Sequence, residues 1–235
     1  MAGGEPVGAE VPVREAATVI LLQDGAAGLE TWLMRRVPKM AFAPGMSVFP
    51  GGGVDEADRA GPAVPGQAEV ARRLGTTDEH AAVLLRAAVR EIEEETGVRL
   101  SAADLRPWAR WITPRQEKRR YDTYFFVAVL PAGALASDLS TEASVADWVP
   151  IAEALAEYER GERPMLPPTV LNLTEVGALA DAAAVLAAAG DRELRPITPE
   201  LRPNADGVWV ADLGDGRELP LPDGFVSATG RKLDG

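Results

Sequence analysis

Arg90-Glu91-Ile92-Glu93-Glu94-Glu95-Thr96-Gly97-Val98 is the most informative stretch of this chain. On a helix, where each residue turns by about 100°, Glu91, Glu94 and Glu95 share an arc of about 100°. Ile92 falls on a separate apolar stripe, and Glu93 lies in a third sector. The segment therefore predicts an amphipathic helix that carries three carboxylates on one face.

This carboxylate face is unfavourable for the isolated helix. Like charges at i and i+4 destabilise a helix by roughly a few tenths of a kcal/mol, and glutamates near the C-terminal end oppose the helix macrodipole. Hard divalent cations such as Mg²⁺ or Mn²⁺ take oxygen ligands and would offset the repulsion. Taken alone, the segment leaves two interpretations open, a metal site or a solvated acidic surface.

Sequence signals mark both ends of this helix. Thr76 and Glu79 have the spacing of a capping box, and Gly97 is a typical C-terminal stop, so we expect a helix that ends at Thr96. Further helices are expected at Ala152–Arg160 and Thr174–Ala189. Strands are expected at Ala17–Leu22, Leu29–Arg36, Ser47–Phe49, Ala109–Ile112, Tyr121–Leu130 and Trp148-Val149.

Composition excludes several classes of protein. With 36 acidic and 24 basic residues the formal net charge is -12, so nucleic-acid binding is not expected. The absence of cysteine excludes disulfides and cysteine nucleophiles, and His80 is the single histidine. Neither a signal peptide nor an apolar run of membrane-spanning length is present. We expect a cytoplasmic protein that does not bind membranes.

The segment Arg90 to Val98 resembles the second half of the Nudix box, R-E-U-x-E-E-x-G-U, where U is a bulky aliphatic residue. The first half of that box is a Gly followed six positions later by a Glu. Gly52 and Asp58 stand at that spacing, after the usual lead-in Phe49-Pro50-Gly51-Gly52. The chain departs from the pattern in two ways, because Asp replaces Glu and because residues 59–89 stand where the box has only seven.

The flanks of the box resemble a branch of the family related to peroxisomal coenzyme A hydrolases. Leu33-Met34-Arg35-Arg36, Gly45 and the Phe-Pro-Gly-Gly lead-in resemble the segment before the box in coenzyme A diphosphatases. Ala41 stands where that segment usually has an Arg. Arg119-Arg120-Tyr121-Asp122-Thr123 and Trp148-Val149-Pro150 are also similar to that branch.

This resemblance implies an α/β (α+β) Nudix fold, a mixed β-sheet sandwiched between helices. It implies cleavage of nucleoside diphosphates linked to another group, with Mg²⁺ or Mn²⁺ as the cofactor. Glu91 and Glu95 would be the main metal ligands, joined by the Gly51 carbonyl, and Glu94 would be a further ligand or would position water. Arg90 would orient the carboxylates.

Residues outside the box are further candidates. Glu142 is the candidate for an additional catalytic carboxylate, with an exposed loop acid as the alternative. A basic cluster is expected to hold substrate phosphates, unless it is a solvated loop, and Tyr121 would either stack on a base or pack in the core. His80 is expected to be structural. The expected phosphate-binding residues are Arg36, Arg115, Arg119 and Arg120.

We expect three parts along the chain: a flexible tail at 1–14, the Nudix domain at 15–190, and an extension at 191–235. The extension should contain a hairpin formed by Val208–Val210 and Glu218–Leu221. The insertion at about 59–77 is expected to be a surface loop, with a short helix near Glu69–Arg73.

The expected activity is that of a pyrophosphatase acting on a small-molecule nucleotide. Coenzyme A or an acyl-coenzyme A is the favoured substrate, and ADP-ribose, NADH-like dinucleotides and nucleotide sugars are alternatives. Two other classes stay open, a catalytically silent Nudix domain that senses a nucleotide and a structural interaction protein. The sequence leaves the oligomeric state open, a homodimer included.

Overall fold

The fold is seen in a computed structural model, which describes residues 11–37, 44–139 and 143–222. Its centre is a mixed sheet in the order β3-β2-β1-β6-β5-β8, with β4 paired to β1 and β7 paired to β2. β1 and β6 run parallel, whereas β1 and β2 form an antiparallel hairpin. The strands are β1 (Val13–Gly25), β2 (Gly28–Arg36), β3 (Ser47–Val48), β4 (Gly51–Gly53), β5 (Arg106–Ile112), β6 (Arg120–Val129), β7 (Ala143–Pro150) and β8 (Pro196–Ile197).

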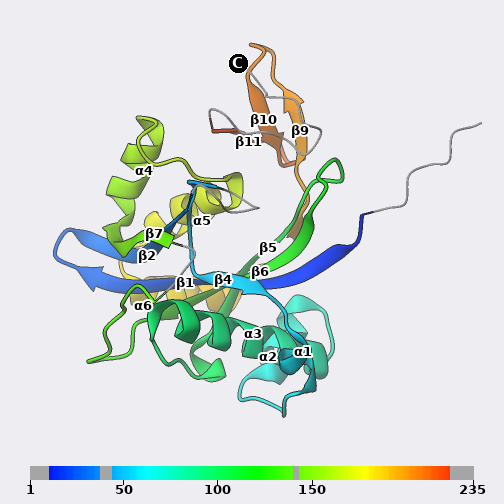
Figure 1. Ribbon diagram of the computed structural model, residues 1–235, viewed down its shortest axis with the longest axis vertical. Helices are drawn as coiled ribbons and strands as arrows, with labels where there is room; N and C mark the ends of the chain where they lie inside the picture. The colour runs from blue at the N-terminus through cyan, green and yellow to red at the C-terminus, as the bar shows by residue number, and fades with distance from the viewer. Residues whose placement is uncertain (1–10, 38–43, 140–142, 223–235) are drawn as a thin grey trace, which may run out of the picture.

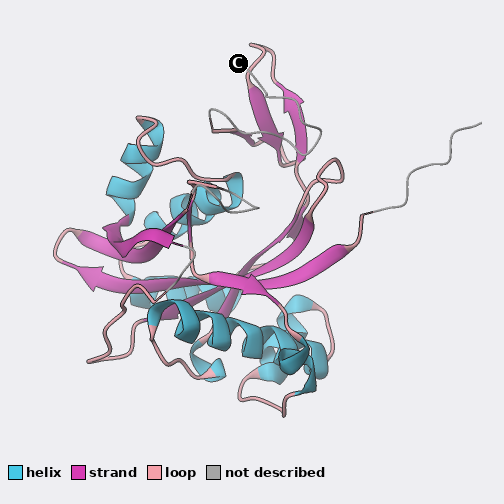
Figure 2. Ribbon diagram, in the orientation of Figure 1, coloured by secondary structure: helices cyan, strands magenta, loops and turns pink. Residues whose placement is uncertain are grey.

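Helices cover both faces of the sheet, as Figures 1 and 2 show. One face packs against α3 (Asp78–Thr96), preceded by α1 (Glu56–Ala60) and α2 (Gln67–Leu74); the short helix η1 (Ala102–Asp104) follows α3. The opposite face packs against α4 (Ile151–Glu159), α5 (Pro167–Gly177) and α6 (Ala182–Asp191). This is the predicted α/β sandwich.

Alternation along the buried strand β1 produces these two cores. Successive side chains of a strand point to opposite faces. Val19 and Leu21 accordingly join the core under α3, whereas Ile20 and Leu22 join the core under α4 to α6. Because both faces of β1 are covered, its sequence reads as a continuous apolar run.

The expected helix of the glutamates is confirmed, with one change at its start. The helix begins one residue later than the predicted capping box at Thr76 implies, because the Thr77 hydroxyl accepts a hydrogen bond from the His80 backbone N–H. The Thr76 hydroxyl is instead bonded to the His80 ring, 2.6 Å from Nδ1. Gly97 ends the helix with φ 72°, a left-handed conformation that favours glycine.

The segment 59–77, expected as a surface loop with a short helix, is more helical than expected, because α1 reaches Ala60 and α2 spans Gln67–Leu74. The short helix expected near Glu69–Arg73 is present, and it is α2. Val70 and Ala71 are buried in the same core as α3, whereas residues 61–63 are largely exposed. The segment 59–77 therefore contains a helix that shares the core of the domain.

Two other boundaries differ from expectation. The single helix expected at Thr174–Ala189 is two helices, α5 and α6, with Asp181 capping the second through the Ala184 N–H. β1 begins two residues inside the expected tail. The C-terminal hairpin is confirmed as β10 (Trp209–Asp212) and β11 (Glu218–Pro220), and β9 (Glu200–Pro203) adds a third strand.

No single described helix is long and apolar enough to cross a membrane, and α5 and α6 meet that test only as a pair bent by 108°.

Candidate active site

A glycine-rich strand lies directly against the glutamate face of α3. Phe49 is buried in the core, and the Val19 N–H donates to the Pro50 carbonyl over 2.9 Å, which fixes the start of the strand. β4 then pairs with β1, with Gly51 opposite Thr18. The Gly51 N–H donates to Glu95 Oε2 over 2.8 Å. The strand and the helix are thus joined at one of the predicted ligands.

Two of these positions need glycine for different reasons. At Gly51, φ is 154° and a Cβ would lie 2.5 Å from the Ala17 carbonyl oxygen. At Gly52, a Cβ would lie 2.5 Å from Glu91 Oε1. At Gly51 the close contact would be with backbone, which can shift only at a large cost in free energy. At Gly52 it would be with the flexible end of the Glu91 side chain. The close approach therefore brings the glycine backbone next to both Glu91 and Glu95.

Arg90 connects the glutamates to one another and to the chain before α3. Its Nη1 donates to Glu91 Oε1 over 2.8 Å and to Glu94 Oε2 over 3.1 Å. Its Nη2 donates to the Gly53 carbonyl over 2.9 Å and to Asp58 Oδ2 over 2.9 Å. One guanidinium therefore holds two of the predicted ligands in fixed positions, as the resemblance implies for this arginine.

Asp58 is the acid that replaces the usual Glu of the box. It is 4% exposed and also accepts from the backbone N–H of Asp55 over 2.8 Å. Although residues 59–89 separate it from Arg90 in sequence, α1 returns it to contact with that guanidinium. The split halves of the motif are therefore adjacent in space.

We expect Asp58→Asn to lower the free energy of unfolding by about 1–2 kcal/mol, because a charged hydrogen bond in a largely buried position is lost. Turnover should fall roughly tenfold, since partners that orient metal ligands affect activity by about 10- to 100-fold. Denaturant unfolding and steady-state kinetics measure the two effects. Glu56→Gln, an exposed acid on the same helix, is the matched control, and equal behaviour of the two variants would contradict this role for Asp58.

The glutamates differ in burial and in charge environment. Glu95 is buried at 9% exposure, while the side chain of Glu94 is 58% exposed. Burial raises the pKa of Glu91, and the hydrogen bond from Arg90 opposes this shift. Glu93 points elsewhere and pairs with Arg99 over 2.8 Å. The helical geometry expected for the segment is thus observed.

The donor set of this site fits a hard divalent cation. Among the residues that the structure describes, no three His, Asp or Glu side chains already form a closed metal cluster. Carboxylate oxygens of Glu91, Glu94 and Glu95 with a backbone carbonyl of the glycine strand nevertheless form an oxygen-only set of the kind that Mg²⁺ or Mn²⁺ prefers.

The other predicted residues lie on different elements. Arg115 and Arg119 are exposed on the loop between β5 and β6. Arg120 is buried and donates from Nε to the Thr113 carbonyl over 3.2 Å, and Tyr121 at the start of β6 is half-buried. Arg36 ends β2, and Glu142 lies outside the described residues. The structure therefore groups Gly51, Arg90, Glu91, Glu94 and Glu95, but not Arg115 or Arg119, with the glutamate face.

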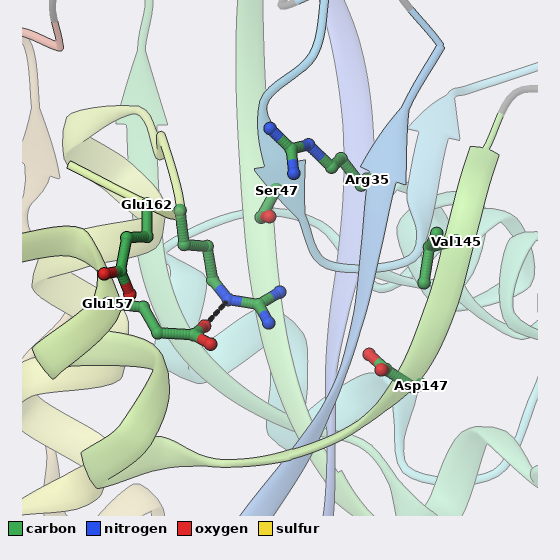
Figure 3. A pocket seen from close by; sticks show the side chains of 7 residues that line it. Arg35, Ser47, Val145, Asp147, Glu157 and Glu162 are labelled. Atoms are coloured by element: carbon green, nitrogen blue, oxygen red, sulfur yellow. Dashed lines mark hydrogen bonds and ion pairs between the residues drawn. The ribbon is translucent and has the colours of Figure 1, made fainter. Parts of the chain in front are cut away.

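Sequence reasoning missed a small hollow between β2, β3, β7 and the end of α4 (Figure 3). Its polar lining comes from separate elements, and only strand pairing brings these residues together. The one sequence signal was the run of charged residues from Glu157 to Arg163, which spans the end of the expected helix. Its lining residues include Arg35, Ser47, Asp147, Glu157 and Arg163.

Comparison with known proteins gives a family match over most of the chain. A model of the NUDIX domain matches residues 12–168. A solved NUDIX hydrolase from Alicyclobacillus acidocaldarius is 25% identical with a TM-score of 0.63, covering 76% of this chain and 97% of that chain. The NUDIX domain of Shewanella oneidensis NrtR, solved with ADP ribose, is 14% identical with a TM-score of 0.49, covering 70% of this chain and 88% of its own. No curated protein sequence matches the chain.

Proposed function

The chain belongs to the NUDIX domain family, and on that premise we propose that its glutamate face is the metal-dependent centre of a pyrophosphatase. The substrate would be a nucleoside diphosphate linked to a second group. The observation that carries the proposal is the contact of Glu91 and Glu95 with the glycine strand. A solvated acidic surface would not need glutamates held against backbone in this way.

Glu91, Glu94, Glu95 and the Gly51 carbonyl would hold the cation. Bound Mg²⁺ or Mn²⁺ supplies positive charge for phosphate oxygens and acidifies a bound water. Arg90 orients Glu91 and Glu94 through its two bonds from Nη1, and the bond to Glu91 opposes the rise in pKa that burial causes at that carboxyl. The Gly51 N–H fixes one carboxylate oxygen of Glu95 against the glycine strand.

Proton removal and phosphate binding would fall to further residues of the chain. A carboxylate within hydrogen-bond reach of water can act as the general base, and we propose Glu94 or Glu142 for this role. Guanidinium groups bind phosphate in bidentate fashion, so Arg36, Arg115, Arg119 and Arg120 are proposed to hold substrate phosphates. Tyr121 is proposed to contact the same substrate.

Coenzyme A is the proposed substrate within this class. The spacing of Arg36, Gly45 and the Phe49–Gly52 lead-in supports it, whereas Ala41 lacks the second cation of that segment. The 3′-phosphate of coenzyme A should need a dedicated cation, and Arg119 or Arg120 is proposed to supply it.

We expect kcat/KM for coenzyme A to exceed that for dephospho-coenzyme A and for ADP-ribose under one metal condition. The physical reason is the extra contact between a guanidinium and the 3′-phosphate, which is worth roughly tenfold in affinity. Steady-state kinetics on the three compounds measures it. A higher value for ADP-ribose would reject coenzyme A as the substrate, and hydrolysis of the phosphoanhydride bond would still stand.

A further inference from the structure

A single carboxylate, that of Glu15 on β1, connects the sheet to both α1 and α3. Its Oε2 accepts from Arg59 Nη2 on α1 over 2.8 Å, and its Oε1 is bonded to the His80 ring nitrogen Nε2 on α3. The His80 ring is held from its other side, where Nδ1 lies 2.6 Å from the Thr76 hydroxyl. Because α1 and α3 lie on the same side of the sheet (Figure 1), Glu15 fixes the two helices relative to each other.

The backbone of Glu15 is fixed by the sheet. Its carbonyl accepts from the Val54 N–H over 3.0 Å, directly after β4. The next residue, Ala16, pairs with Gly53 of β4, and Glu15 itself pairs with Asp122 of the parallel strand β6. Because paired strands on two sides hold this backbone, the Glu15 side chain is a firm anchor for the helices that it contacts.

The helix α1 needs anchors of this kind. It has only five residues, and helices shorter than about 12 residues are marginally stable on their own. α3 holds it at Asp58, whose carboxylate accepts from Arg90 over 2.9 Å and whose carbonyl accepts from Arg86 over 2.7 Å. Arg59 is the next residue, and its bond to Glu15 ties the same turn to the sheet. The placement of Asp58 therefore depends on contacts from both α3 and β1.

The charge environment of Glu15 favours both of its bonds. Burial raises the pKa of the Glu15 carboxyl, but the hydrogen bonds from Arg59 and His80 outweigh burial, and the net shift of the pKa is downward. The carboxyl is therefore ionised at neutral pH. Hydrogen bonds to an ionised acceptor are about twice as strong as those between neutral groups, so Glu15→Gln weakens the anchor while it keeps the size of the side chain.

We propose that Glu15 is a positioning residue for the cation site of the glutamate face, an inference that rests on the proposed function. Through Arg59 it holds α1 in place, and α1 keeps Asp58 against the guanidinium of Arg90. That guanidinium in turn orients two of the glutamates that would hold the cation. Glu15 thus acts through other side chains, from a strand that lies outside the Nudix box.

Calorimetric titration of the full chain with Mn²⁺ alone tests the inference without turnover. Partners that orient metal ligands change metal affinity by about 10- to 100-fold, and Glu15 acts at one further remove, so Glu15→Gln should weaken Mn²⁺ binding about fivefold. Arg59→Gln breaks the same ion pair from an exposed position and should weaken binding to the same extent. Thermal unfolding without metal measures the stability of each variant separately.

The effect of Glu15 should disappear when Asp58 is already altered. Contacts in one network are not additive, so adding Glu15→Gln to Asp58→Asn should weaken Mn²⁺ binding by less than about twofold further. A merely structural role would instead lower the midpoint of thermal unfolding and leave the Mn²⁺ affinity of Glu15→Gln unchanged. Unchanged affinity, or a further loss of about fivefold in the double variant, would overturn the inference.

Glu69→Gln is the matched control, because Glu69 forms an exposed ion pair with Arg72 on α2. Its loss should leave Mn²⁺ affinity within about twofold, since exposed pairs contribute little, and an equal loss in Glu69→Gln and Glu15→Gln would reject the inference. Hydrolysis of ADP-ribose is measured in parallel. Mn²⁺ binding and turnover in the wild-type protein without any effect of Glu15→Gln reject this inference alone. Absence of both in the wild-type protein rejects the proposed function and this inference with it.

Discussion

Glu91→Gln and Glu95→Gln should each lower kcat by at least about 100-fold, because each removes one negative charge from the cation site. The fold should be unaffected. In Glu95→Gln the side-chain oxygen can still accept the hydrogen bond from the Gly51 N–H, which spans 2.8 Å in the wild-type protein. In Glu91→Gln the side-chain oxygen can still accept a hydrogen bond from Arg90. Steady-state turnover at saturating Mg²⁺, together with thermal unfolding of each variant, measures the effect.

Glu93→Gln is the matched control for this prediction. Glu93 sits between the two ligands in sequence but faces away and pairs with Arg99. Its substitution should leave turnover within about twofold, since exposed ion pairs contribute little. If Glu93→Gln were as damaging as Glu95→Gln, net acidity of the helix rather than this one face would govern activity, and the assigned site would be wrong.

Gly52→Ala should lower kcat by about 100-fold with little loss of stability. The new Cβ would lie 2.5 Å from Glu91 Oε1, so the carboxylate must move, and a displacement of about 1 Å in a catalytic constellation can change the rate by about 100-fold. The flexible end of a side chain gives way more easily than backbone, so the midpoint of unfolding should hardly change. Turnover and denaturant unfolding report the two quantities.

Gly53→Ala is the control on the adjacent residue. A Cβ at Gly53 would meet only the Glu15 carbonyl oxygen at 4.0 Å, an ordinary contact. This variant should therefore keep near wild-type turnover. A similar loss of activity at both positions would mean that the strand tolerates no side chain anywhere, and the specific approach of Gly52 to Glu91 would not explain the result.

The sequence allowed the central part of the fold and the glutamate face to be predicted, because local rules control them. The 3.6-residue period places Glu91, Glu94 and Glu95 together without any tertiary information. Strands such as β1 and β6 contain long apolar runs, which can be recognised from the sequence alone. Helix geometry also placed Arg90 next to Glu94, whereas its role in orienting the carboxylates was implied by the family resemblance.

Features that depend on tertiary packing were not predictable. α2 was only partly recognised, because its core contact through Val70 and Ala71 uses a surface that α3 supplies. The break between α5 and α6 depends on the cap at Asp181. It also depends on Asp24 of β1, whose Oδ1 accepts a hydrogen bond from the Ala182 N–H over 2.9 Å. The hollow of Figure 3 depends on the register of three strands, which the sequence pattern does not fix.

The most direct test of the central claim is product analysis of the wild-type protein with ADP-ribose and coenzyme A, with Mg²⁺ or Mn²⁺ and then with a chelator. We expect release of a nucleoside monophosphate or its 3′-phosphorylated form from at least one compound. We also expect loss of product when the metal is chelated and recovery when metal is restored. Tight nucleotide binding without turnover would indicate a sensor, and that result would contradict the account.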